Sequence, residues 1–172
     1  MTATNETVTV GETAAFEAFY RSEFRRVVAV AYALSGSRVG AEDLAQEAFI
    51  AAHRRWDEIG RFERPEAWVR RVVTYKAVSA YRRRMSEARA LARVAGRRQE
   101  VLPELEPDDA AFWRAVRSLP RRQAQAIALH YLEDRSISEV ADILGCTPST
   151  ARVHLFNGRR ALAEKLGLEV TA

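Results

Sequence analysis

Apolar side chains recur at steps of three and four residues along most of the chain, which is the spacing of one face of an α-helix. A first run extends from Phe16 to Leu34 and stops at Ser35-Gly36, and a second extends from Gly40 to Trp56. Pro65 suits the first position of a third helix, which ends in the arginines 82–84. No segment alternates convincingly with the period of a strand, so the sequence predicts an all-α fold.

The helical pattern is interrupted once, between about Met85 and Asp109. Residues 100–109 contain five acidic residues and two prolines, which disfavour a packed element. Helices are predicted again for 110–118, 121–133, 137–144 and 149–166. The sequence therefore predicts two small helical domains joined by a flexible linker, with boundaries at 14–85, 86–109 and 110–168.

Positive charge is concentrated in the middle of the chain. Residues 64–99 carry 11 basic and 2 acidic side chains, whereas the whole chain of 172 residues has a net charge of only +4. Such a basic block is typical of a surface that binds a polyanion, because lysine and arginine near phosphates release condensed counterions. A solvated helix face or a basic arm is the alternative that composition leaves open.

Composition argues against several other classes of protein. Cys146 is the only cysteine, so no internal disulfide is expected, and the three histidines have no metal-ligand spacing. The sequence contains no phosphate-binding glycine loop, nucleophile elbow or pair of catalytic carboxylates, so we expect neither an enzyme nor a cofactor. Because there is no signal-peptide pattern or membrane-spanning apolar run, we expect a cytoplasmic protein without membrane insertion.

A helix-turn-helix is predicted near the C-terminal end of the chain. Residues 136–145 form a short helix that Ser136 or Ser138 can cap and that Gly145 ends, and Ser149 is expected to open the next helix. Arg in such a recognition helix can bind guanine, while Asn or Ser can bind other base edges. The residues predicted to face DNA are Ser149, Thr150, Arg152, His154, Phe156, Asn157, Arg159 and Arg160. A similar helix pair also occurs in helical bundles that do not bind DNA.

Three segments resemble parts of one protein family. Residues 119–132, followed by 138–145, resemble region four of bacterial sigma factors, although similar short sequence motifs occur in response-regulator output domains. The stretch 42–49, Glu-Asp-Leu-Ala-Gln-Glu-Ala-Phe, is similar to the region-two signature, and residues 68–84 resemble the basic helix that melts promoter DNA. Together these segments resemble an extracytoplasmic-function (ECF) sigma factor of the sigma-70 family, with regions two and four only.

The resemblance implies roles for particular residues in region two. It places Asp43, Gln46, Glu47 and Arg54 against the β′ clamp helices of core RNA polymerase. Contacts to the minus-ten element are implied for Arg61, Phe62, Arg64, Trp68, Arg70, Arg71, Tyr75, Lys76 and Arg82. Tyr75 and Ser79 stand where relatives usually have Asn and Asp, and Trp68 is at least as well explained as a core residue.

In region four the resemblance implies binding to the minus-thirty-five element, where His154 and Asn157 replace residues that are commonly Arg. The partners it implies are core polymerase, through the β′ clamp helices and the β flap, together with promoter DNA and an anti-sigma protein. The acidic linker could either imitate phosphates or serve as a plain tether. A helix-turn-helix regulator that acts without core polymerase is the alternative function.

Overall fold

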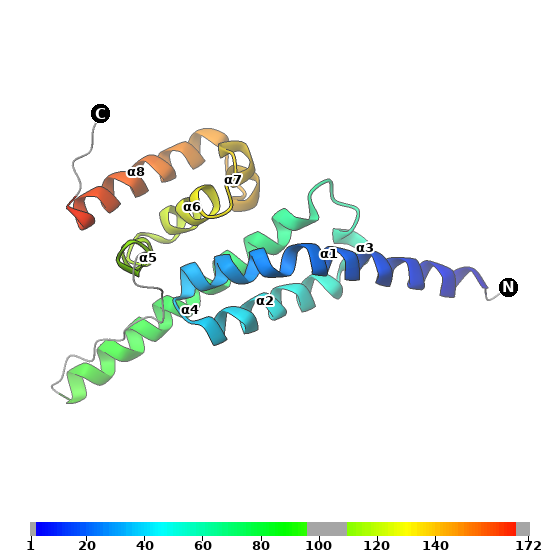
Figure 1. Ribbon diagram of the computed structural model, residues 1–172, viewed down its shortest axis with the longest axis horizontal. Helices are drawn as coiled ribbons and strands as arrows, with labels where there is room; N and C mark the ends of the chain where they lie inside the picture. Colours follow the sequence, from blue (N-terminus) through cyan, green and yellow to red (C-terminus); the bar gives the residue numbers. More distant parts are fainter. Residues whose placement is uncertain (1–2, 96–109, 168–172) are drawn as a thin grey trace.

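The computed structural model describes residues 3–95 and 110–167, and every regular element in these two ranges is an α-helix (Figure 1). The prediction of an all-α fold is confirmed. The first range contains α1 (Ala3–Ser35), α2 (Arg38–His53), α3 (Trp56–Ile59) and α4 (Pro65–Ala95). The second range contains α5 (Ala110–Arg117), α6 (Arg121–Tyr131), α7 (Ile137–Leu144) and α8 (Pro148–Leu166).

Helices α1, α2 and α4 pack side by side into an N-terminal bundle (Figure 1). The chain reverses between α1 and α2 at Gly36, whose φ of 72° suits glycine, and the Ser37 hydroxyl then caps α2 by accepting from Gly40 N–H. Buried alanines at positions 41, 45, 48 and 52 allow α2 to lie close to its neighbours. An aromatic cluster closes the far end of the bundle: Phe16, Phe19, Tyr20, Phe24, Phe49 and Trp56.

Several predicted helix boundaries in this bundle are wrong. Helix α1 begins at Ala3, well before the predicted Phe16, and α2 begins at Arg38 rather than at Gly40. The second helix was expected to reach Trp56 but ends at His53, and Trp56 instead starts the short α3 within the expected loop. Helix α4 begins at Pro65 as predicted but continues to Ala95, beyond the expected end at residue 84. Residues 85–95 are mostly Ala, Arg, Met, Glu and Leu, which favour helix even without an apolar stripe. The predicted linker therefore does not begin at 86, and its remaining residues, 96–109, lie outside the described ranges.

Helices α5 to α8 form the C-terminal domain, with the predicted helix-turn-helix in α7 and α8. Ser136 caps α7 in a reciprocal capping box with Glu139, and Gly145 ends it with φ 65° and ψ 44°. Thr147 caps α8, so that helix begins at Pro148 rather than at the predicted Ser149. The core side of α8 is as predicted, with Ala151, Leu155 and Leu162 buried.

The two domains pack directly against each other, an arrangement that no sequence pattern predicts. Helix α1 contacts α5 and α6, and α4 contacts α6 and α7. One apolar cluster includes Val30 and Leu34 of α1, Ala77 and Val78 of α4, and the core of the C-terminal domain. No helix in the described ranges is long and apolar enough to span a membrane.

Candidate nucleic-acid interface

Helix α8 presents the predicted recognition surface. Six of the eight predicted side chains are exposed: Ser149, Thr150, Arg152, Phe156, Arg159 and Arg160. His154 and Asn157 are half-buried, and burial together with the charge of Arg122 lowers the pKa of His154. Both effects disfavour the protonated, positively charged form of His154.

The first turn of α8 is ordered by hydroxyl groups. Thr147 Oγ1 accepts from Thr150 N–H and lies 2.9 Å from both Ser149 Oγ and Thr150 Oγ1. Val153 was not among the predicted contacts, although it is 55% exposed on the same helix as Arg152 and Phe156. Its place directly after Arg152 in the sequence could have indicated a DNA contact, because an exposed apolar side chain in a recognition helix can contact a thymine methyl group.

Two features hold α8 close against α6, a glycine and an arginine. Gly158 lets α8 approach α6 closely, since a Cβ atom there would lie 3.0 Å from Ile127 Cγ1. Arg159 donates to the Tyr131 hydroxyl, and its guanidinium carbon lies 5.4 Å from the Tyr131 ring centre. Arg159 is thus partly held by the domain itself, whereas Arg152 has no such tether among the interactions of the described residues.

The residues predicted to contact the minus-ten element fall into two groups in the structure, one within the N-terminal domain and one in contact with the C-terminal domain. Arg61 and Phe62 are exposed in the turn before α4. Trp68 is half-buried against the core of the N-terminal bundle, with the Arg55 guanidinium carbon 5.7 Å from its ring centre. Lys76 donates to Glu47 Oε2 over 2.7 Å, so it links a predicted DNA contact to a predicted polymerase contact.

The other five predicted minus-ten residues contact the C-terminal domain: Arg64, Arg70, Arg71, Tyr75 and Arg82. Arg64 Nη2 lies 2.6 Å from Glu139 Oε1, and its Nη1 lies 3.1 Å from Asp142 Oδ2. The Arg121 guanidinium carbon lies 4.3 Å from the Tyr75 ring centre. These contacts were not foreseen, because the partners lie 37 to 78 positions apart and no local sequence pattern pairs residues over such distances.

Arg70 is the most deeply buried of this group, with no exposed surface. Its Nη2 donates to Glu133 Oε1 over 2.8 Å, its Nε donates to Glu133 Oε2, and its Nη1 lies 2.7 Å from Glu23 Oε2. Burial opposes the charged guanidinium, but the two carboxylates outweigh it and raise the pKa of Arg70 above its ordinary value. In this arrangement Arg70 cannot reach a DNA phosphate.

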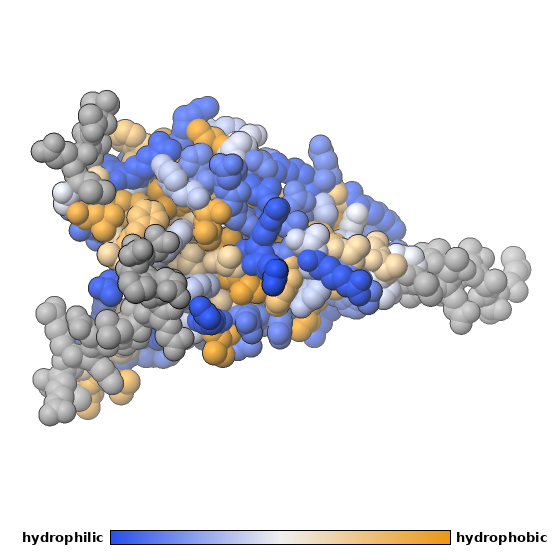
Figure 2. Space-filling model, in the orientation of Figure 1, coloured by the Kyte–Doolittle hydropathy of each residue, from blue (hydrophilic) through white to orange (hydrophobic). Residues whose placement is uncertain are grey.

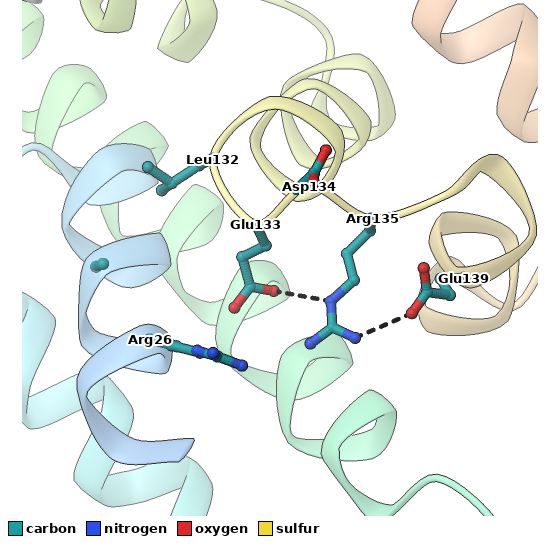
Figure 3. A pocket seen from close by; sticks show the side chains of 7 residues that line it. Arg26, Leu132, Glu133, Asp134, Arg135 and Glu139 are labelled. Carbon is teal, nitrogen blue, oxygen red and sulfur yellow. Dashed lines mark hydrogen bonds and ion pairs between the residues drawn. The ribbon is translucent and has the colours of Figure 1, made fainter. Parts of the chain in front are cut away.

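A polar pocket of about 410 Å³ lies beside this junction, between α1 and the turn from α6 to α7 (Figure 3). Arg26 faces it from α1, and Glu133, Arg135 and Glu139 face it from the C-terminal domain. Arg135 bridges the two acids, with Nη1 3.1 Å from Glu139 Oε1 and Nε 3.7 Å from Glu133 Oε2. The edge of the C-terminal domain that meets α4 is therefore an ordered array of carboxylates.

The predicted polymerase contacts form a surface on and just after α2. Asp43, Gln46, Glu47 and Arg54 are all exposed. Next to Gln46 and Arg54 lies an apolar pocket of about 290 Å³, lined by Phe16, Tyr20, Phe49 and Ile50. Ile50 was not among the predicted contacts, although it is 51% exposed and follows Gln46 by one helical turn. A polar patch beside an exposed apolar pocket is suited to a protein partner.

A second apolar pocket lies on the C-terminal domain. It has a volume of about 230 Å³ and is lined mainly by Phe112, Tyr131, Leu162 and Leu166. Figure 2 shows apolar surface gathered toward the end of this face formed by α5 and α8. Among the described residues no group of His, Cys, Asp and Glu could hold a metal ion, and Cys146 is a half-buried free thiol.

Comparison with known protein families matches both domains. The model of sigma-70 region 2 matches residues 19–87, and the model of sigma-70 region 4 matches residues 109–162. The chain is 26% identical over 155 residues to the ECF RNA polymerase sigma factor SigW of Bacillus subtilis, covering 82% of this chain and 83% of SigW. It is 31% identical to the ECF sigma factor SigE of Mycolicibacterium smegmatis, covering 85% of this chain and 59% of SigE.

Solved structures show the same architecture. The sigma factor RpoE of Bartonella quintana, in complex with the anti-sigma factor NepR, superposes with a TM-score of 0.65 at 25% identity, covering 90% of this chain and 98% of RpoE. CnrH, in complex with the cytosolic domain of CnrY, has a TM-score of 0.64 at 21% identity and shares the fold. Since both domains match their counterparts in the expected order, this chain belongs to the sigma-70 family of RNA polymerase sigma factors, in its ECF group.

Proposed function

We propose that the two domains divide promoter recognition between them. The N-terminal bundle binds core polymerase through α2 and opens the minus-ten DNA with α4, while α8 of the C-terminal domain binds the minus-thirty-five duplex. The observation that carries this proposal is the presence, in one chain, of an exposed polar recognition helix and a separate exposed surface at Asp43 to Arg54. A regulator acting without polymerase would leave that second surface, and the region-two match, without a use.

The partners follow from the same surfaces. The polar patch and apolar pocket of α2 are suited to bind the β′ clamp helices. The apolar pocket beside Tyr131 is the proposed binding site for the β flap. An anti-sigma protein is a further partner, supported by structural neighbours that were solved with anti-sigma factors. The chain acts in the cytoplasm with the polymerase and contributes no catalytic group of its own.

Transcription with purified core polymerase and a library of promoter fragments tests the proposal, combined with two variants. Arg152→Ala is expected to weaken binding to the selected promoter duplex by about 1–3 kcal/mol if Arg152 binds a base, and to leave core binding unchanged. Asp43→Lys is expected to weaken core binding and spare duplex binding. Asp43 is a cleaner choice than Glu47, because Glu47 also pairs with Lys76.

Glu42→Lys is the matched control for Asp43→Lys, since Glu42 is an exposed acid one residue away on a different side of α2. It makes the same change of charge outside the proposed contact. The proposal fails if the wild-type chain neither binds core polymerase nor directs initiation. The division of labour fails if both variants lose both activities while their helical circular dichroism is unchanged.

A further inference from the structure

Two arginines in the described ranges are buried, and only one of them has acidic partners. Arg70 has no exposed surface and pairs with Glu133 and Glu23. Arg117, the last residue of α5, is only 4% exposed, and no carboxylate of residues 3–95 or 110–167 forms an ion pair with it. A buried charge is normally paired, because a charge that leaves water without a partner is strongly destabilised. Arg117 therefore lacks a counter-ion.

The guanidinium group of Arg117 is only partly hydrogen-bonded. Its Nη1 donates to the Ala33 carbonyl oxygen over 2.9 Å, whereas its Nε and Nη2 are buried and have no hydrogen-bond partner among the described residues. Burial lowers the pKa of Arg117, and Tyr81 partly offsets this effect. The positive charges of Arg84 and Arg114 lower this pKa further. A nearby anion would balance the charge of Arg117.

A pocket of about 310 Å³ lies beside Arg117, between the end of α4 and the segment that follows α5. Helix α4 lines it with Arg82, Ser86 and Arg89, which share one face because they are four and three residues apart. All three of these residues are exposed, and no residue that lines the pocket is acidic. The volume is at the lower end of the range for small-molecule sites. A small pocket with three arginines and no acid is suited to a small anion.

A phosphate group suits this pocket better than a carboxylate. Free phosphate and phosphate monoesters carry close to two negative charges at pH 7 and have at least three terminal oxygens. One such group can accept from Arg82 and Arg89 together while it neutralises the charge of Arg117. A carboxylate has one charge and two oxygens. An internal phosphate of a nucleic-acid strand also has one charge and two free oxygens, so it is less well matched than a monoester.

We propose that this pocket binds inorganic phosphate or the phosphate monoester of a small molecule, with Arg82 and Arg89 as direct ligands and Arg117 as the buried counter-charge. The Nε and Nη2 edge of Arg117 can bind two oxygens of one anion after a shift of the guanidinium group. The site shares only Arg82 with the residues predicted to contact the minus-ten element. It goes beyond the proposed function, and its test needs neither polymerase nor promoter.

Thermal unfolding of the full chain at rising concentrations of inorganic phosphate tests the site. Sodium chloride keeps the ionic strength constant, so that charge screening does not change along the series. A ligand that binds only the folded chain raises Tm, and the rise grows with ligand concentration. Isothermal titration calorimetry with inorganic phosphate gives the affinity directly. Glycerol 3-phosphate and glycerol are the second pair of probes, of which only the phosphorylated compound should bind.

Three variants locate the binding. Arg89→Met removes an exposed direct ligand, and Arg93→Met is the matched control, because Arg93 is an exposed arginine one turn further along α4 and outside the pocket. Arg89→Met should weaken phosphate binding about tenfold, through loss of a charge-assisted hydrogen bond, and Arg93→Met should bind like the wild type. Arg117→Met should abolish the dependence of Tm on phosphate.

A wild-type Tm that does not change when phosphate replaces chloride would overturn the proposal, as would an unchanged phosphate response in Arg117→Met. Equal affinities of Arg89→Met and Arg93→Met would also overturn it, and this comparison remains decisive if Arg117→Met does not fold. Displacement of phosphate by a single-stranded oligonucleotide without terminal phosphates would assign the pocket to a nucleic-acid backbone, and the small ligand proposed here would then be wrong.

Discussion

Replacing Arg70 by methionine should lower the free energy of unfolding by about 3–5 kcal/mol, because it leaves two carboxylates at the domain junction without their cation. Glu133 is 4% exposed and Glu23 is 15% exposed, so water cannot fully solvate either one. Methionine retains most of the volume of the aliphatic stem, which confines the loss to charge pairing rather than packing.

Arg71→Met is the matched control, since Arg71 is the neighbouring arginine but is exposed and donates to backbone carbonyls. Its removal should cost only about 1 kcal/mol, because the freed carbonyls can be hydrated. The triple variant Glu23→Gln/Arg70→Met/Glu133→Gln should recover at least half of the loss, since it removes the unpaired charges together with the cation.

Urea unfolding followed by circular dichroism and tryptophan fluorescence measures these differences. Trp56 and Trp68 report on the N-terminal bundle and Trp113 on the C-terminal domain, so coincident curves would justify a two-state analysis. A loss for Arg70→Met no larger than that of Arg71→Met would refute the reasoning. A triple variant no more stable than the single variant would do so as well.

Two further predictions concern α7. The hydrogen bond from Ser136 N–H, followed by the Ser136 hydroxyl and Arg135, lowers the pKa of Glu139 from 4.5 to about 2, so its stabilisation is complete above pH 4.5 and disappears as the pH falls toward 2. Because the carboxylate is partly exposed, we expect wild type to exceed Glu139→Gln by only about 1 kcal/mol at neutral pH, with the difference closing below pH 4.5 in urea titrations. Gly145→Ala should cost about 1 kcal/mol because φ is 65° there, and Gly145→Asn should cost less; equal stability of both variants and wild type would contradict the backbone argument.

Local features of this protein could be read from the sequence. Pro65 at a helix start, Ser136 as one of two candidate caps, and Gly145 at a left-handed helix end each depend on atoms within a few residues. The buried face of α8 was also predictable, because the spacing of Ala151 and Leu155 follows from the period of the helix. The same period placed Arg152 and Thr150 on the exposed side.

Helix ends without a strong stop signal were predicted less well. The arginines at 82–84 were interpreted as the end of α4, although arginine favours helix. The helix continues through residues that no longer have apolar side chains at helical spacing. Periodicity detects an amphipathic face, and a helix that projects beyond its bundle has no face to bury.

Only the tertiary structure decided which charges meet. Arg70 and Glu133 are 63 residues apart, and Arg64 and Glu139 are 75 apart, distances over which no local pattern reports pairing. The sequence therefore determined that α4 is basic and that the C-terminal domain has acids in the turn before α7 and along that helix. Whether α4 faces solvent or those acids depends on how the two domains pack, because burial at the domain junction converts a weak surface attraction into a specific contact.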